Sequence, residues 1–391
     1  MNNKPYDFVL FESTRARNHH KDMEMIAHML IESGMKVAIA EVYVEAERCK
    51  DTSIPHIKFE KKFQEKFIEV EDGYSPLSRF AKNRVIMHRY GEYLKYVAKQ
   101  LNSMTKNIYA GSQENGHPFS WVKFVDPDIK IYLWGLRSFR MYEYKLKPFS
   151  LSGIHSYFNT KYYWYPNMYY FVSDEMIKAE YLKLGVEEKH LIIRPERTTP
   201  ELHPVVQKSH NDDFNLLSIG MLRPDKRIEV VIDAVKQINN PSINYIIAGK
   251  TSDREAYEPV IEEAMEGTKN IVRKNYRLSN DEFNSLMSNA DFLVLCDVQQ
   301  ASNVTNGTMN EALLLGKPII APNYNPYKYF VEKYGVGILF DPTDRKSLVS
   351  AILSAKEKGA YSFNNNILEY QKTLLYSKVR DQFVNELKNK I

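Results

Sequence analysis

A polar loop and the helix after it combine groups that can bind an anion with a group that can bind a diol. Thr305, Asn306, Gly307 and Thr308 stand directly before an apolar helix, so they can cap it and leave its first backbone amides open. Such a helix start favours a phosphate. Glu311, which we expect in the first turn, could accept two hydrogen bonds from a vicinal diol such as a ribose. Alternatively, Glu311 only complements the helix dipole.

A second cluster of candidate residues follows the apolar run "FNLLSIG" (214–220). Gly220 permits a tight turn of the backbone. Arg223 and Lys226 come next, before another helix, and both could reach across the turn to a diphosphate. The alternative is an ordinary solvated helix start, in which the two cations are surface charges.

Short apolar runs that alternate with helical patterns must position these residues. Near-continuous apolar strands alternating with amphipathic helices, such as residues 228–238, are typical of parallel sheets covered on both faces. The first half of the chain has runs at 7–13, 36–44, 107–112, 130–136, 168–173 and 190–195, and the second half at 214–220, 243–249, 270–276, 291–296, 317–322 and 336–341.

The two series of strands predict two doubly wound, Rossmann-like α/β domains. Residues 196–213 contain two prolines and no periodicity, which indicates a linker. We therefore expect domains at 1–199 and 200–391, allowing the last helix to pack back on the first domain. Two such domains facing each other would form a cleft at the carboxyl ends of the strands, where open α/β sheets bind ligands.

These motifs resemble the family-four retaining glycosyltransferases of the GT-B fold, also called glycosyl transferases group 1. The matching segments are "SIGMLRPDKR" (218–227), "YIIAGK" (245–250) and "NEALLLGKPIIAP" (310–322). The resemblance covers about residues 165 to 355. It implies an N-terminal acceptor-binding domain and a C-terminal domain that binds a nucleotide diphosphate sugar.

The resemblance also assigns roles to individual residues. It implies that Arg223, Lys226, Glu311 and His117 are catalytic, although His117 could equally be an ordinary loop histidine. The donor-binding residues it implies are Gly220, Gly249, Lys250, Tyr276, Asn303, Asn306, Gly307, Thr308 and Glu311.

Two features depart from the family pattern. Asn303 stands eight residues before Glu311, where the family usually has a glutamate expected to touch the donor sugar. The N-terminal glycine-rich loop of the family is replaced by "ESTRARNHH" (12–20). The first departure puts donor choice and activity in doubt.

The resemblance implies transfer with retention and without a metal or other cofactor, because fixed cations can stabilise the departing phosphate. Asp126 and Asp128 have an Asp-x-Asp spacing that could hold Mg²⁺ or Mn²⁺. Pro127 between them favours a turn that feeds the next strand. The histidines and cysteines lack a zinc-site spacing.

Composition and charge narrow the class of protein. The chain has 391 residues, of which 43% are hydrophobic and 26% charged, as expected of a globular protein. A net charge of +4 is too small to indicate a nucleic-acid partner. The N-terminal apolar run is too short for a signal peptide or membrane span, and the 2 cysteines fit a reducing compartment, so we expect a cytoplasmic protein.

Residues 56–70 suggest a contact with a membrane. Phe59, Phe63 and Phe67 recur every four residues among several lysines, so a helix here would be amphipathic and basic. Such a helix over 57–70 could rest on anionic lipid at the inner face of the cell membrane. The alternative is that the phenylalanines belong to the core.

Together these features predict a hexosyltransferase-type glycosyltransferase of polysaccharide biosynthesis, acting on a glycan, polysaccharide or lipid-linked acceptor. A nucleotide-sugar epimerase or hydrolase of the same architecture remains an alternative. The change to Asn303 also leaves open a non-catalytic subunit that binds a nucleotide sugar.

Overall fold

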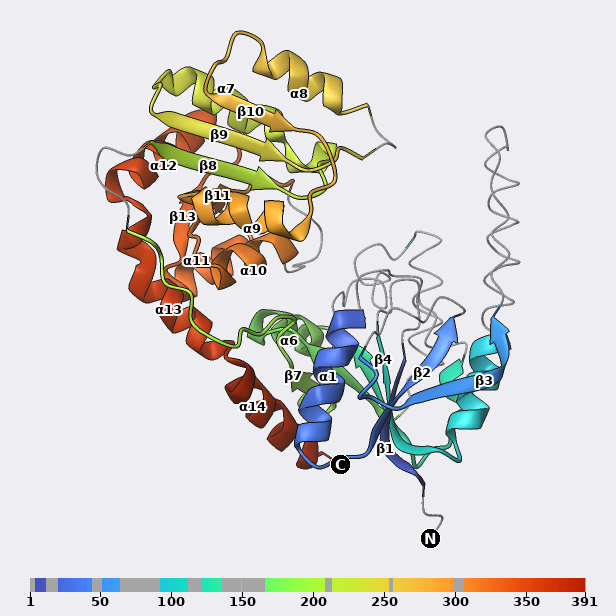
Figure 1. Ribbon diagram of the computed structural model, residues 1–391. Helices are drawn as coiled ribbons and strands as arrows, with labels where there is room; N and C mark the ends of the chain where they lie inside the picture. Colours follow the sequence, from blue (N-terminus) through green and yellow to red (C-terminus); the bar gives the residue numbers. More distant parts are fainter. Residues whose placement is uncertain are drawn as a thin grey trace, which may run out of the picture. The chain divides into compact units, whose positions relative to one another are not determined.

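The computed structural model describes residues 4–11, 20–43, 51–63, 92–111, 121–135, 149, 166–207, 213–252, 256–298 and 306–390. The chain divides into two compact units. The first comprises Met1–Glu196 with Arg380–Ile391, and the second comprises Arg197–Val379. Each unit is built on one parallel sheet (Figure 1), which confirms the predicted α/β class.

The first unit contains a seven-stranded sheet of order β3-β2-β1-β4-β5-β6-β7. All neighbouring strands run parallel, as the near-continuous apolar sequences of all but β3 predict. Its strands are β1 (Tyr6–Phe11), β2 (Val37–Tyr43), β3 (His56–Phe63), β4 (Thr105–Ala110), β5 (Lys130–Trp134), β6 (Met168–Val172) and β7 (Leu191–Ile193).

Aromatic side chains fill much of the core of the first unit. The ring of Tyr132 lies 5.4 Å from that of Phe8 and 5.2 Å from that of Phe171. Phe171 also meets Phe383 edge to face at 5.0 Å. The helices of this unit are α1 (His20–Glu32), residues 92–101, η1 (Val122–Phe124), α6 (Glu175–Lys183), η3 (Glu188–His190) and the part of α14 (Tyr376–Lys388) from Arg380 onward.

The expected amphipathic helix at 56–70 is wrong for residues 56–63, which form strand β3. This strand pairs in parallel with β2, and Phe59 is buried. A spacing of four residues keeps side chains on one face of a strand as well as of a helix, so the phenylalanine pattern could not separate the two. Residues 64–70 lie outside the described part of the chain. Among the described helices, none is both long and apolar enough to cross a membrane.

The second unit contains a six-stranded parallel sheet of order β10-β9-β8-β11-β12-β13. From β8 the chain forms β9 and then β10 at one edge of the sheet. It then returns to form β11 beside β8, followed by β12 and by β13 at the other edge. The order therefore reverses between β8 and β11. The strands are β8 (Phe214–Ile219), β9 (Ile243–Ala248), β10 (Ile271–Lys274), β11 (Phe292–Val294), β12 (Ile319–Pro322) and β13 (Gly337–Phe340).

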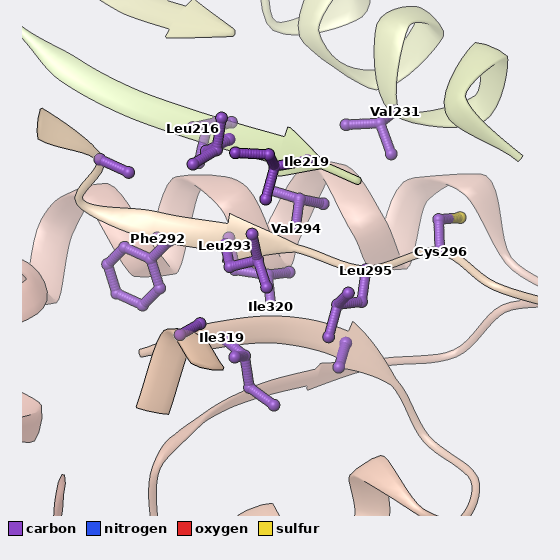
Figure 2. Close-up of a cluster of buried hydrophobic side chains, with 14 of the residues drawn as sticks. Leu216, Ile219, Val231, Phe292, Leu293, Val294, Leu295, Cys296, Ile319 and Ile320 are labelled. Carbon is purple, nitrogen blue, oxygen red and sulfur yellow. The ribbon is translucent and has the colours of Figure 1, made fainter. Parts of the chain in front are cut away.

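The core of the second unit lies on its central strands. Figure 2 shows Leu216 and Ile219 of β8 beside Leu293 of β11 and Ile319 and Ile320 of β12. The helices are η4 (Pro224–Lys226), α7 (Ile228–Ile238), α8 (Glu258–Met265), α9 (Asn280–Asn289), α10 (Gly307–Leu314), α11 (Tyr327–Tyr334), α12 (Arg345–Lys358), η5 (Ala360–Phe363) and α13 (Asn364–Thr373).

The segment that links the two units is hydrogen-bonded to the second unit. The Thr199 amide donates to the Leu374 carbonyl at 2.9 Å, and the Tyr376 amide donates to the Thr199 carbonyl at 2.9 Å. Further along, the His203 amide donates to Gln371 Oε1 at 2.7 Å. The linker predicted at 196–213 therefore has a defined path on the second unit as far as residue 207.

Candidate functional site

The candidate site lies where the strand order of the second unit reverses, at the carboxyl ends of β8 and β11. In open α/β sheets, ligands bind in the crevice at such a switch point. The loop after β8 carries Arg223 and Lys226, and the loop after β11 carries Asp297. The two loops are tied together through their backbones, because the Val298 amide donates to the Asp225 carbonyl at 2.7 Å.

Asp297 connects three elements of the site through one carboxylate oxygen. Its Oδ2 accepts from Lys226 Nζ at 2.7 Å, from Asn306 Nδ2 at 2.8 Å and from the Tyr327 hydroxyl at 2.7 Å. The carboxylate is buried, with 8% of the residue exposed. Burial and then the charge of Asp297 raise the pKa of Tyr327, so this hydroxyl stays protonated and donates. Lys226 and Asn306 were predicted from the sequence to be site residues. Both contact Asp297, which was not predicted.

Helix α10 begins with the predicted polar cap, but two of the amides that were expected to stay open donate to the cap itself. Asn306 Oδ1 accepts from the amides of Thr308 at 2.9 Å and Met309 at 3.2 Å. Because the cap is Asn306, the first helical turn starts at Gly307 and holds no acidic residue. The expectation that Glu311 lies in the first turn is thus wrong. Since the dipole effect fades beyond the first turn, complementing the dipole explains Glu311 less well than expected.

Gly220 and Gly249 allow the loops after β8 and β9 to approach one another. Both adopt positive φ, at 116° and 119°, which side chains rarely tolerate. A Cβ on Gly249 would lie 2.0 Å from the Gly220 carbonyl oxygen, and a Cβ on Gly220 would lie 3.5 Å from Thr308 Oγ1. These glycines therefore let the ends of β8 and β9 lie against one another, and Gly220 lies beside the start of α10.

Arg273 supports this glycine contact from the neighbouring strand. Its guanidinium donates to the Gly249 carbonyl at 2.9 Å and to both oxygens of Glu258, at 2.9 and 2.8 Å. Thr251, two residues after Gly249, also bonds to Glu258 and receives a 2.8 Å bond from the same guanidinium. The turn after β9 is consequently fixed by a charged network.

Arg223, Lys250 and Tyr276 occupy exposed positions around the site. Arg223 makes a paired contact with Asp225 through two bonds of 2.9 Å, which lower the pKa of that carboxyl group. Lys250 follows β9 with an exposed side chain. Tyr276 follows β10, and its hydroxyl donates to Glu282 at 3.1 Å, a bond that raises the tyrosine pKa. All three stand after the carboxyl ends of strands, where a ligand in the crevice could be reached.

Glu311 forms an ion pair that the sequence did not reveal. Arg197 Nε lies 3.1 Å from Glu311 Oε1, and both side chains are about two-fifths exposed, at 41% and 39%. Arg197 was treated only as part of a linker, and nothing in its sequence context indicated this contact. Asp297 did carry a signal in the sequence, because it is the first polar residue after the apolar run 292–296.

Several predicted residues are not part of this described arrangement. His117 and Asn303 lie outside the described residues, as does Thr305. Asp126 and Asp128 occupy an exposed turn before β5, where the Ile129 amide donates to the Asp126 carbonyl at 3.0 Å, which confirms the turn interpretation. Within the described segments, no cluster of three or more histidine, cysteine or acidic side chains could hold a metal ion.

Comparisons with known proteins show which family and which fold the chain resembles. Residues 201–373 match the family model of the glycosyl transferases group 1. The whole chain is similar in fold to HepE (Alr3699) from Anabaena in complex with UDP, with a TM-score of 0.68, 13% identity, and coverage of 98% of this chain and 100% of that chain. No curated protein matches the sequence significantly.

Two further solved structures show the same architecture. The lipopolysaccharide outer core galactosyltransferase WaaB matches with a TM-score of 0.66 at 11% identity, covering 98% of this chain and 100% of that chain. Sucrose-phosphate synthase from Thermosynechococcus elongatus matches with a TM-score of 0.66 at 14% identity, covering 98% of both chains. At these identities the structures show the fold. The predicted resemblance is therefore confirmed: residues 201–373 match the glycosyl transferases group 1, and the whole chain has the GT-B fold.

Proposed function

We propose that the second unit binds a nucleoside diphosphate sugar at the switch point and that the chain transfers the sugar, with retention, to a glycan, polysaccharide or lipid-linked acceptor. The observation that carries this proposal is the convergence of Lys226, the Asn306-capped start of α10 and the close Gly220–Gly249 turns. These groups supply a cation, the positive end of a helix dipole and open backbone, all of which favour a diphosphate.

The proposed chemistry places negative charge on the departing diphosphate while the sugar becomes cationic. A fixed cation about 4 Å from this charge contributes up to about 4 kcal/mol at an effective dielectric constant near 20. The ion pair between Lys226 and Asp297 reduces that contribution but holds the ammonium group in place. The helix start adds its backbone dipoles. In this proposal the protein's own groups stabilise the leaving group, and no metal ion is needed.

Glu311 has the chemistry to recognise the ribose. A carboxylate offers two acceptor oxygens, which suits the two hydroxyls of a ribose. Glu311 lies on the same helix as the anion-binding start, four residues after Gly307. A nucleotide whose phosphates meet the helix start can therefore reach Glu311 with its sugar one helical turn away.

The test is a panel of UDP, GDP, ADP and TDP sugars incubated with the purified protein and scored for binding, hydrolysis and transfer. HepE from Anabaena has been solved with UDP-glucose, so this donor is the first to try. We expect one nucleoside diphosphate to bind and its sugar to be transferred, with the product anomer matching the donor. Epimerised or hydrolysed donor without transfer would favour the alternative enzyme, and binding without turnover would favour a non-catalytic subunit. A protein that binds none of the panel would contradict the proposal.

A further inference from the structure

The carboxylate of Asp297 contacts both groups that the proposed function assigns to anion binding, Lys226 and the Asn306 cap of α10. It follows β11, whereas Lys226 ends the η4 turn after β8 and Asn306 caps α10. Lys226 and Asn306 come from separate loops, yet both donate to one oxygen, Asp297 Oδ2. A change at Asp297 would therefore loosen the lysine and the helix cap at once.

The hydrogen-bonding capacity of each partner leaves room for a ligand. An ammonium group has three donors, so Lys226 can donate to Asp297 and to a phosphate oxygen together. Asn306 divides its amide between two tasks, with Nδ2 directed to Asp297 and Oδ1 to the amides of Thr308 and Met309. The carboxylate thus selects which end of the Asn306 amide faces the helix. Were the amide reversed, its N–H groups would oppose the helix amides and the cap would be lost.

Tyr327 is a third group that holds the Asp297 carboxylate. Its hydroxyl accepts from Asn306 Nδ2 at 2.8 Å and donates to Asp297 Oδ2 at 2.7 Å, and the residue is 2% exposed. Cys296, next to Asp297, is buried as well, and burial raises the pKa of its thiol to about 12. A thiol that stays neutral adds no second negative charge next to Asp297.

We infer that Asp297 is a positioning residue for the leaving diphosphate: it holds the Lys226 ammonium and the Asn306 cap in the arrangement that receives the phosphates, without itself touching the substrate. This inference rests on the proposed function. It opposes a simpler view in which Asp297 is only a counter-charge that competes with the phosphates for Lys226. The two views give opposite signs when the charge is removed.

The decisive variant is Asp297→Asn, which keeps the shape of the side chain and removes its charge. A positioning role predicts a diphosphate affinity about tenfold weaker, the scale of one charge-assisted hydrogen bond, with a much smaller change for the nucleoside monophosphate. A competing counter-charge predicts tighter diphosphate binding. Calorimetric titration of the wild type with UDP, GDP, ADP and TDP first selects the probe, and the variant is then titrated with that diphosphate and its monophosphate.

Asp291→Asn is the matched control. Asp291 lies just before β11, at the opposite end of the strand from Asp297, is also 8% exposed, and accepts the Asn215 amide at 2.7 Å. This control should lose stability without losing diphosphate affinity. Equal losses of affinity in both variants, or unchanged or tighter binding in Asp297→Asn, would overturn the inference.

Tyr327→Phe keeps the test decisive if Asp297→Asn does not fold. This variant removes one donor from Oδ2 and leaves both Lys226 and Asn306 unaltered in sequence. We expect a two- to threefold weaker diphosphate affinity, about the scale of a neutral hydrogen bond. Unchanged affinity in this variant would then overturn the inference. Failure of the wild type to bind any of the four diphosphates would instead contradict the proposed function, so the two failures are distinguishable.

Discussion

Arg197 Nε and Glu311 Oε1 lie 3.1 Å apart, so the carboxylate proposed to bind the ribose already has a cationic partner in the segment that links the two units. The path of this segment is fixed two residues later, where Thr199 is bonded to Leu374 and Tyr376. The pair is about two-fifths exposed, and ion pairs of this kind contribute only about 0–1 kcal/mol to stability. A ribose can therefore replace the guanidinium at little cost.

Replacing Glu311 with Gln should weaken binding of the nucleoside diphosphate by about 1.5–3 kcal/mol, the scale of a charge-assisted bond. An amide offers one acceptor oxygen and a misplaced donor in place of two charged acceptors. Stability should fall by less than about 1 kcal/mol, because only an exposed ion pair is lost. Calorimetry and urea denaturation measure the two quantities separately. An affinity equal to that of the wild type would remove Glu311 from the site.

Arg197→Gln provides the complementary prediction. It leaves the Glu311 carboxylate intact and removes its competitor, so the nucleoside diphosphate should bind as tightly as in the wild type or up to about fivefold more tightly, within the small free energy of an exposed ion pair. The measurement is the same calorimetric titration. A marked loss of affinity would mean that Arg197 itself contacts the ligand and is not displaced by it.

Removal of metal ions should leave transfer unchanged, because the proposed stabilisation of the leaving group relies on Lys226 and the start of α10. Activity should survive excess EDTA. The double change of Asp126 and Asp128 to Asn should keep turnover within a few-fold, since these residues form an exposed turn before β5. Loss of transfer in EDTA and its recovery with Mn²⁺ would show that the reaction depends on a metal.

The strands of both sheets were largely predictable because each is a short, continuous apolar run with a polar segment on either side. For example, the predicted run 243–249 corresponds to β9, and helix α7 matches the predicted residues 228–238. Strand β3 was missed because "HIKFEKKF" is rich in lysine and its phenylalanine spacing fits both periods. Its pairing with β2 is a non-local interaction that local periodicity does not contain.

The candidate site was predictable only in part. Residues in local turns and caps could be identified from the sequence, whereas contacts between residues distant in the sequence could not. Gly220, Lys226, Asn306 and Thr308 lie in recognisable turns and caps, and the structure brings them together. Their partners are distant in sequence: Lys226 and Asp297 are separated by 71 positions. Such pairs form only when the strand order folds back at the switch point, so no local pattern identifies them.

The closest backbone contact of the site leads to the last prediction, Gly249→Ala. Alanine at Gly249 must adopt a φ of 119°, and its Cβ would overlap the Gly220 carbonyl oxygen at 2.0 Å. Strained backbone and overpacking each cost about 1–3 kcal/mol, so we expect a loss of about 3 kcal/mol or more in the free energy of unfolding.

Gly267→Ala is the matched control in the same unit, because Gly267 has a φ of 76° with nothing within 4 Å of its added Cβ, and it should lose only about 1–2 kcal/mol. Urea denaturation measures both losses. Movement of Gly220 away from the new methyl group should also weaken nucleotide binding in Gly249→Ala but not in Gly267→Ala. Equal stabilities for the two variants would show that the loops after β8 and β9 are not held together at this contact.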